Sequence, residues 1–412
     1  MTATRAGTAP APARETALTR QAAVGVLLAV VAAAVAFALH GTTFWGVDFG
    51  VFHGAGTTVL HGGSPYDAAY NQFLLFLYPP FAAVLFTPLG LLKANAAYAL
   101  WTLLSVLALE GVVWMLLGAV GVGPRGRRAT LTLAVTVAAL PLSPILSNLS
   151  LGQVNLILMI VILDDLLHDR GRLRGIGVGV AAGIKLIPLI VILYFLATRR
   201  FRAAAVAAVS FAATVAIGFL LMPGASRTYW SGTFLDASRG VSESANPYNM
   251  SIRSMLLRLP APEAHSPWLL LAISAVVGIG GLAVAGRAVR SGNEHAGIVA
   301  CAVTGLLVSP TTWPAHWVWC VPLLVFWAGR TRRGTWSPYE RLGFTALSLI
   351  LLAPSYWMLR MFVEGDPGVQ ASFWPQLFVK IYAPLGLLIL AAIAVFLWRG
   401  DRRAREGAPL LS

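Results

Sequence analysis

Three ionisable side chains stand in segments of this sequence that are otherwise almost wholly apolar. Asp48 follows the first apolar run among aromatic residues, and Lys185 lies in the middle of another apolar segment. His316 lies in a turn rich in tryptophan. An apolar setting raises the pKa of a carboxyl group, which suits a general base. Lysine often binds phosphate, and histidine can act as an acid or a base near neutral pH. The three are therefore candidate functional residues.

Each candidate also has an ordinary structural explanation. Asp48 can be an interfacial carboxylate that caps a helix, and Lys185 can extend its ammonium group to the lipid headgroups. His316 can be a satisfied interfacial histidine in a belt of aromatic residues. Arg253 can bind the same anion as Lys185, or it can be an exposed interfacial arginine. An ionisable group at membrane depth costs about 2.5 kcal/mol or more, so function is the default hypothesis for such residues.

The composition is that of a membrane protein. Of the 412 residues, 58% are hydrophobic and only 11% are charged, whereas soluble domains carry about 25% charged residues. This composition excludes a water-soluble globular enzyme, a disordered chain and a nucleic-acid-binding protein. We predict an all-α polytopic membrane protein with no nucleic-acid partner.

Arginines in short loops determine the predicted orientation. The net charge is +14, and placing the basic loops inside gives cytoplasmic termini. Segments 1–20 and 399–412 are then cytoplasmic tails, and 21–398 is one integral-membrane domain. We interpret the first apolar run as an uncleaved span and not as a signal peptide. The segments predicted to cross once are 22–40, 96–118, 130–147, 153–167, 201–222, 268–288, 296–309, 315–329, 342–362 and 377–398.

Two apolar segments do not fit as single spans. Segment 175–198 is basic at both ends, so we predict two short helices with Lys185 near their outer apex. Segment 73–92 contains three prolines, and we predict a re-entrant or partial helix there. The prediction is a bundle of about 12 crossings with a re-entrant segment.

This topology brings separate polar stretches to the outer face. They are the outer loops 41–72 and 223–266, the connection 148–155, Lys185, and the turn 309–317. The second loop contains Asp236, Arg239 and Asn246 as well as Asn249 and Arg253. The sequence thus predicts an active site on the outer face.

Other polar clusters have structural explanations. The acidic group at the end of span 153–167 resembles a metal site, but its position favours capping and ion pairing. Glu110 lies inside a span and is either a proton-relay group or a buried, hydrogen-bonded carboxyl. The glycines of segment 175–183 are typical of close helix packing. We predict no metal site. The acidic group consists of Asp164, Asp165 and Asp169 with His168.

Several short motifs occur in a defined order between about residues 45 and 320. They are Val47-Asp48-Phe49, Ser64-Pro65-Tyr66, Tyr78-Pro79-Pro80-Phe81-Ala82, Leu149-Ser150-Leu151-Gly152-Gln153-Val154-Asn155, Gly183-Ile184-Lys185-Leu186-Ile187-Pro188, Asn249-Met250-Ser251-Ile252-Arg253, and Ser309-Pro310 followed by His316-Trp317. The set resembles integral-membrane glycosyltransferases of the GT-C type, specifically the bacterial α-(1→2)-mannosyltransferases of glycosyltransferase family 87. Two positions depart from the family pattern, since Met250 replaces a glutamine and Ala315 replaces the first of two histidines.

The resemblance implies that polyprenyl-phosphate-mannose is the sugar donor, a substrate and not a cofactor. It implies a mannolipid or lipoglycan acceptor of the cell envelope, and inverting transfer outside the bacterial plasma membrane. Asp48 would be the general base, while Lys185 and Arg253 would hold the donor phosphate. No cofactor and no nucleotide sugar are expected. The other pocket residues implied are His316, Tyr78, Gln153, Asn155, Asn249 and Trp313.

Three alternatives stay open at this stage. A lipid or solute transporter would share the spans and the broken helices, but it should show two related halves. A membrane scaffold would leave Asp48, Lys185 and His316 without a role. Within the enzyme class, the alternative donor is another polyprenyl-phosphate sugar, such as arabinofuranose or glucose.

Overall fold

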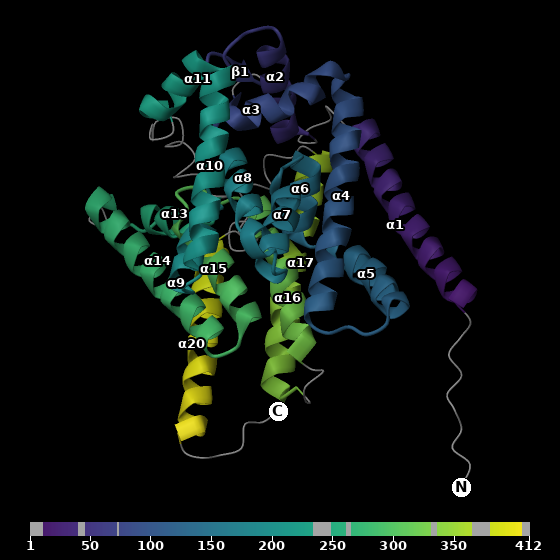
Figure 1. Cartoon of the computed structure of the whole chain (residues 1–412), viewed down its shortest axis with the longest axis vertical. Helices are drawn as coiled ribbons and strands as arrows, with labels where there is room; N and C mark the ends of the chain where they lie inside the picture. Colours follow the sequence, from purple (N-terminus) through teal and green to yellow (C-terminus); the bar gives the residue numbers. More distant parts are fainter. Residues whose placement is uncertain are drawn as a thin grey trace.

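The structure, a computed structural model, describes residues 11–39, 46–71, 74–233, 249–260, 265–330, 336–364 and 380–405. Most of these residues are helical (Figure 1). The strands in the described ranges are β1 (Ala69–Tyr70) and β2 (Leu74–Leu75), which form one antiparallel pair. The predicted all-α class is confirmed, apart from this short ribbon.

Four helices in the described ranges are long and apolar enough to cross a membrane. At 1.5 Å per residue, about 20 residues span the hydrocarbon core of about 30 Å. All four coincide with predicted spans, and the count of twelve crossings stays a prediction. The four are α4 (Ala94–Ala119), α10 (Phe201–Leu221), α14 (Pro267–Arg290) and α20 (Tyr382–Arg405).

Further helices surround these four. Helix α1 packs along α4, and α15 packs against α14 and α20. Gly25 of α1 faces Glu110 of α4, so any larger side chain at position 25 would meet that carboxyl group. The bounds are α1 (Ala11–Leu39), α7 (Asn155–Leu167), η2 (Gly171–Leu173), α15 (Glu294–Val308), η5 (Pro314–Trp319), α16 (Cys320–Gly329) and α17 (Pro338–Glu364).

The predicted span 130–147 is wrong as a single straight helix. The chain forms α5 (Arg125–Ala139) and α6 (Ser143–Leu151), which meet at an angle of 80°. Pro141 and Pro144 explain the break, because proline lacks an N–H donor and disfavours helical backbone in the residue before it. Helix α6 ends at Gly152, whose φ of 73° is the left-handed conformation that favours glycine.

The prediction of two short helices in segment 175–198 is confirmed. They are α8 (Ile176–Ile184) and α9 (Leu189–Ala197), and Lys185 takes an extended conformation directly after α8. The glycines of α8 allow close packing, as predicted. A Cβ at Gly179 would collide with the carbonyl oxygen of Ala207 in α10. Helix α8 is therefore held against a long helix, with Lys185 at its free end.

The segment 41–72 was predicted as a loop, but most of its described part is helix α2 (Val47–Leu60).

Segment 73–92 contains α3 (Pro80–Phe86) and η1 (Thr87–Leu91), which are too short for a full span, as predicted. These helices lie beside α11 at the upper end of the molecule in Figure 1. Gly56 permits the contact of α2 with α3, because a Cβ there would collide with the carbonyl oxygen of Phe86.

The second predicted loop, 223–266, also contains helices. They are α11 (Pro223–Thr228), the π-helical turn η3 (Tyr229–Thr233) and α13 (Ile252–Leu257). Asp236, Arg239 and Asn246 lie outside the described residues.

Candidate active site

The candidate site begins at the first turn of α2. Gly46 precedes this helix with a φ of 74°, and its N–H donates to the carbonyl oxygen of Ser150 at 2.7 Å. The hydroxyl of Tyr98 donates to the same carbonyl oxygen at 2.7 Å. The ring of Phe49 lies 5.3 Å from that of Tyr98. These contacts fix the start of α2, and with it Asp48, against the end of α6.

Gln153 joins Asp48 to Lys185. Its Nε2 donates to Oδ2 of Asp48 at 2.7 Å, and its Oε1 accepts from Nζ of Lys185 at 3.3 Å. The hydroxyl of Tyr78 donates to the same Oε1 at 3.2 Å. Gln153 is also buried. Its one amide group therefore holds a carboxylate on one side and a cation on the other, away from bulk water.

Lys185 is surrounded by side chains from three separate segments. Its Nζ donates to Oδ1 of Asn155 at 3.0 Å and lies 2.9 Å from Nε2 of His316. The ring of Tyr78 lies 5.3 Å from Nζ, within the range of a cation–π interaction. Residues 78, 153, 155, 185 and 316, which are distant in the sequence, therefore meet at one point.

Backbone contacts hold His316 at this point. The N–H of Trp313 donates to Nδ1 of His316 at 3.2 Å, which leaves the proton of the neutral ring on Nε2. Asn155 donates from Nδ2 to the carbonyl oxygen of Ala315 at 2.9 Å. Asn155 thus ties the turn to Lys185. Trp313 contributes its backbone N–H to this arrangement.

Asn249 braces the turn 309–317. Its Oδ1 accepts from the backbone N–H groups of Thr312 at 3.0 Å and Ser251 at 3.1 Å. Its Nδ2 donates to the carbonyl oxygen of Pro310 at 3.1 Å. Asn249 is fully buried, so its side chain positions the turn that carries His316.

Arg253 is not part of this hydrogen-bond network. It lies in α13, and its Nε is buried without a hydrogen-bond partner among the described residues. Hydrogen bonds and short contacts therefore join Asp48, Gln153, Tyr78, Lys185, Asn155 and His316, and Arg253 contributes to none of these contacts.

The environment of Asp48 raises the pKa of its carboxyl group. Burial is the main cause, because an apolar surrounding disfavours the charged form. The hydrogen bond from Gln153 and the positive charge of Lys185 act in the opposite direction. A carboxylate with this balance can accept a proton from a hydroxyl group more readily than an exposed one.

Two tyrosines that position the site were not predicted from the sequence. Tyr98 fixes the end of α6, and the hydroxyl of Tyr66 donates to the carbonyl oxygen of Tyr78 at 2.7 Å. Tyr66 belongs to the motif Ser64-Pro65-Tyr66, and this motif was the sequence signal that could have identified it. Tyr98 lies in an apolar span where nothing distinguishes it from an ordinary buried aromatic residue.

The acidic group at the end of α7 makes the capping and ion-pair contacts that were predicted. Asp164 pairs with Arg170 and with His168, while Asp165 accepts from the N–H of Val178 at 2.9 Å. Asp169 accepts from a backbone N–H group at 3.0 Å. Within the described residues, no cluster of three or more His, Cys, Asp or Glu side chains is arranged to hold a metal ion.

A carboxylate and a lysine, joined through one amide inside a multi-pass helical membrane protein, form an arrangement suited to an enzyme that transfers a group from an anionic carrier. Comparison with known proteins identifies the family within this class. Residues 76–310 match Glycosyltransferase family 87, and the chain belongs to that family. It is a membrane glycosyltransferase. The matched range contains Gln153 and Lys185, and the flanking regions supply Asp48 and His316.

Named relatives come from mycobacteria. A polyprenol-phosphate-mannose-dependent alpha-(1-2)-phosphatidylinositol pentamannoside mannosyltransferase of Mycobacterium tuberculosis (strain CDC 1551 / Oshkosh) is 35% identical, over 79% of this chain and 75% of that protein. A protein of the same name from Mycolicibacterium smegmatis is 32% identical, over 88% and 86%. A polyprenol-phosphate-mannose-dependent alpha-(1-2)-phosphatidylinositol mannoside mannosyltransferase of Mycobacterium tuberculosis (strain ATCC 25618 / H37Rv) is 30% identical, over 88% of both chains. No solved structure matches the chain.

The brace formed by Asn249 gives the first testable prediction. In Asn249→Ala, the buried N–H groups of Ser251 and Thr312 lose their acceptor, at a cost of about 1–3 kcal/mol each. We expect a lower thermal unfolding temperature and faster hydrogen exchange in peptides covering 309–317. The matched control is Asn249→Asp, which keeps the Oδ1 acceptor and should protect both amides better than alanine. Unchanged exchange in the alanine variant would show that Asn249 does not hold the turn.

Proposed function

We propose that this glycosyltransferase transfers mannose from polyprenol-phosphate-mannose to a phosphatidylinositol mannoside or a related lipoglycan of the cell envelope. The proposed product is an α-(1→2) linkage, formed with inversion at the anomeric carbon. The relatives at 30–35% identity use this donor and make this linkage, according to their names. The observation that carries the proposal is the chain of contacts from Asp48 through Gln153 to Lys185.

The proposed reaction needs a base and an anion site at different positions. Asp48 accepts the proton of the acceptor hydroxyl, and the hydroxyl oxygen forms the new bond to the anomeric carbon. The bond from that carbon to the donor phosphate breaks, and its electron pair leaves with the phosphate. Inversion requires the attacking and leaving oxygens on opposite faces of the sugar. The two ends of Gln153 hold the proposed base and the proposed cation at different positions, which supports this assignment.

Lys185 and His316 are suited to hold the leaving phosphate. The Nε2–H of neutral His316 faces the ammonium group of Lys185, so two nitrogen donors meet at one place. A phosphate oxygen is an acceptor that can satisfy both donors. The oxygens of Asn155 and Tyr78 that surround Lys185 carry no charge.

Arg253 is the remaining proposed phosphate ligand. The buried Nε of this residue has no hydrogen-bond partner in the described part of the chain. Because its guanidinium group stands outside the Lys185 network, Arg253 would act on a more distant part of the donor or acceptor. We assign it a binding role secondary to that of Lys185.

We propose that the site faces the outside of the bacterial plasma membrane and that both termini are cytoplasmic. The arginine-bearing starts of α5 and α10 and the end of α14 lie toward the lower end of the molecule in Figure 1. Helix α2, which carries Asp48, and helix α3, which follows Tyr78, lie toward the upper end. Basic residues remain preferentially on the cytoplasmic side, which supports this orientation.

The direct test of the proposed base is Asp48→Asn. The amide keeps the size of the side chain but cannot accept the hydroxyl proton, so we expect mannose transfer to fall by at least about 100-fold. The measurement uses purified protein, radiolabelled polyprenyl-phosphate-mannose and phosphatidylinositol mannosides as acceptors. Donor binding and the thermal unfolding temperature should stay close to those of the wild type. Near-wild-type turnover would remove Asp48 from the mechanism.

The pH dependence of transfer tests the role of Gln153. Asp48 acts in its ionised form, so kcat/KM should fall as the pH drops through its pKa, which burial has raised. Gln153→Ala removes the hydrogen bond that favours the ionised form, so the pKa rises further and the acid limb moves to higher pH. Asn155→Ala is the control, since Asn155 contacts Lys185 and not the carboxylate. A shift to lower pH, or the same shift in both variants, would contradict this role.

A further inference from the structure

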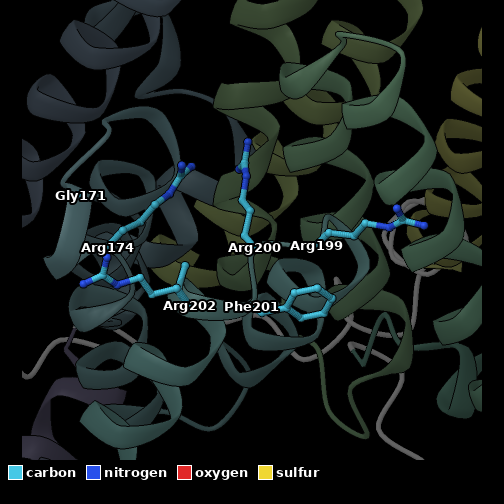
Figure 2. Close-up of a pocket in the computed structure, with 7 residues that line it drawn as sticks. Gly171, Arg174, Arg199, Arg200, Phe201 and Arg202 are labelled. Carbon is cyan, nitrogen blue, oxygen red and sulfur yellow. The ribbon is translucent and has the colours of Figure 1, made fainter.

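A second cavity lies at the opposite end of α8 from Lys185. Its volume is about 320 Å³, and its lining includes Arg174, Arg199, Arg200 and Arg202 (Figure 2). Helix α8 has nine residues, so about 13 Å of helix separates this cavity from the lysine. We call the cavity the arginine cleft. It is separate from the site described above, and the proposed transfer reaction does not use it.

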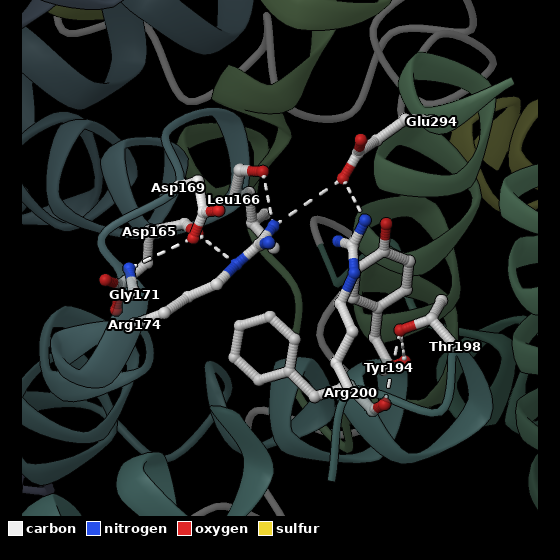
Figure 3. Close-up of polar contacts among 10 residues, drawn as sticks. Asp165, Leu166, Asp169, Gly171, Arg174, Tyr194, Thr198, Arg200 and Glu294 are labelled. Atoms are coloured by element: carbon white, nitrogen blue, oxygen red, sulfur yellow. Dashed lines mark hydrogen bonds and ion pairs between the residues drawn. The ribbon is translucent and has the colours of Figure 1, made fainter. Parts of the chain in front are cut away.

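Two of the arginines are held in place by a shared carboxylate. Nη2 of Arg200 lies 2.5 Å from Oε1 of Glu294, and Nη2 of Arg174 lies 3.6 Å from the same oxygen (Figure 3). Arg174 also donates to the carbonyl oxygens of Asp165 and Leu166 at 3.0 and 2.9 Å. These guanidinium groups are therefore fixed at the wall of the cavity.

The arginines of the cleft are not all paired with carboxylates. Nη1 of Arg200 is buried without a hydrogen-bond partner among the described residues. Arg199 and Arg202 are exposed and form no ion pair within the described ranges. The nearby carboxylates of Asp165 and Asp169 accept from backbone N–H groups. The preference for basic residues in cytoplasmic loops explains why several arginines lie here. It does not explain why Arg174 and Arg200 are held in place by Glu294, or why a buried N–H donor of Arg200 has no acceptor.

The start of α10 adds backbone donors to the same cavity. Phe201, Arg202 and Ala203, the first residues of this 21-residue helix, line it. The first N–H groups of a helix have no acceptor within the helix, and they favour an anion together with the helix dipole. The lining therefore combines guanidinium groups and free amides, which is the donor set that binds phosphate.

Exposed apolar side chains border the cleft. Phe201, which lines the cavity, is 63% exposed, and Leu173 beside it is 58% exposed. Only 22% of the apolar stretch of α10 is buried inside the protein. The end of a membrane-spanning helix lies at the level of the lipid headgroups. A molecule with a phosphate in the cleft can thus place its hydrocarbon chains along α10.

We propose that the arginine cleft binds the phosphate group of an anionic membrane phospholipid. The phosphate contacts Arg200 and the start of α10, and the exposed side chains of Arg199 and Arg202 close over it. The acyl chains lie on Phe201 and the lipid-facing side of α10. This lipid is a bound component of the membrane and not the sugar donor, whose phosphate is assigned to Lys185.

The experiment measures lipid binding to the delipidated full-length protein in detergent, by native mass spectrometry and thermal unfolding. The ligands are phosphatidylglycerol, phosphatidylcholine and inorganic phosphate. The test variant is Arg199→Gln with Arg202→Gln, which leaves the contacts of Glu294 intact. The matched control is Arg125→Gln with Arg127→Gln, which removes the same charge from exposed arginines at the start of α5. Lys185→Ala tests whether the lipid occupies the donor site instead.

We expect phosphatidylglycerol to bind the wild type at least about tenfold more tightly than phosphatidylcholine. The test variant should lose about tenfold in affinity for phosphatidylglycerol, while the control pair and Lys185→Ala should stay within about twofold. Equal losses in the test and control pairs would overturn the proposal, because they would indicate general charge attraction. Equal stabilisation by inorganic phosphate alone would overturn the assignment to a lipid. A selective loss in Lys185→Ala would place the bound lipid in the donor site.

Discussion

The site depends on the amide group of Gln153. A primary amide is both a donor and an acceptor, so one side chain can hold a carboxylate at one end and an ammonium group at the other. A direct Asp48–Lys185 ion pair would neutralise both residues, leaving neither ready to act on a substrate. The amide keeps them apart while fixing their relative positions. Because Gln153 is buried, water does not compete strongly for these hydrogen bonds, and the arrangement is present before substrates bind.

Breaks in helices place this amide and its partners. Pro141 and Pro144 turn the chain between α5 and α6, and Gly152 ends α6 in a left-handed conformation directly before Gln153. Lys185 follows α8 at a second break. Backbone that leaves a helix within a membrane protein needs polar partners or a water-filled cavity. The same breaks that would be costly in lipid therefore place Gln153 and Lys185 among polar partners.

The sequence predicted the parts of the fold that depend on local pattern. The four helices that are long and apolar enough to cross a membrane, and the break at Lys185, follow from hydropathy, charge and proline. The helix that carries Asp48 was missed, because the segment after the first span has polar residues and glycines that resemble a loop. Asn249 and Arg253 share one motif, yet only the structure shows that one braces a turn and the other makes none of the contacts that join Asp48 to Lys185. Motif order predicts which residues meet, but hydrogen-bond roles depend on three-dimensional contacts.

The most direct test of the account is a cryo-EM structure of the inactive Asp48→Asn variant with bound polyprenyl-phosphate-mannose. We predict that a phosphate oxygen lies within about 4 Å of Nζ of Lys185, the distance of an ion pair. The anomeric carbon should face residue 48, with open space between them for the acceptor hydroxyl. A donor phosphate bound away from Lys185, or an anomeric carbon turned away from residue 48, would contradict the assignment of the base and the cation.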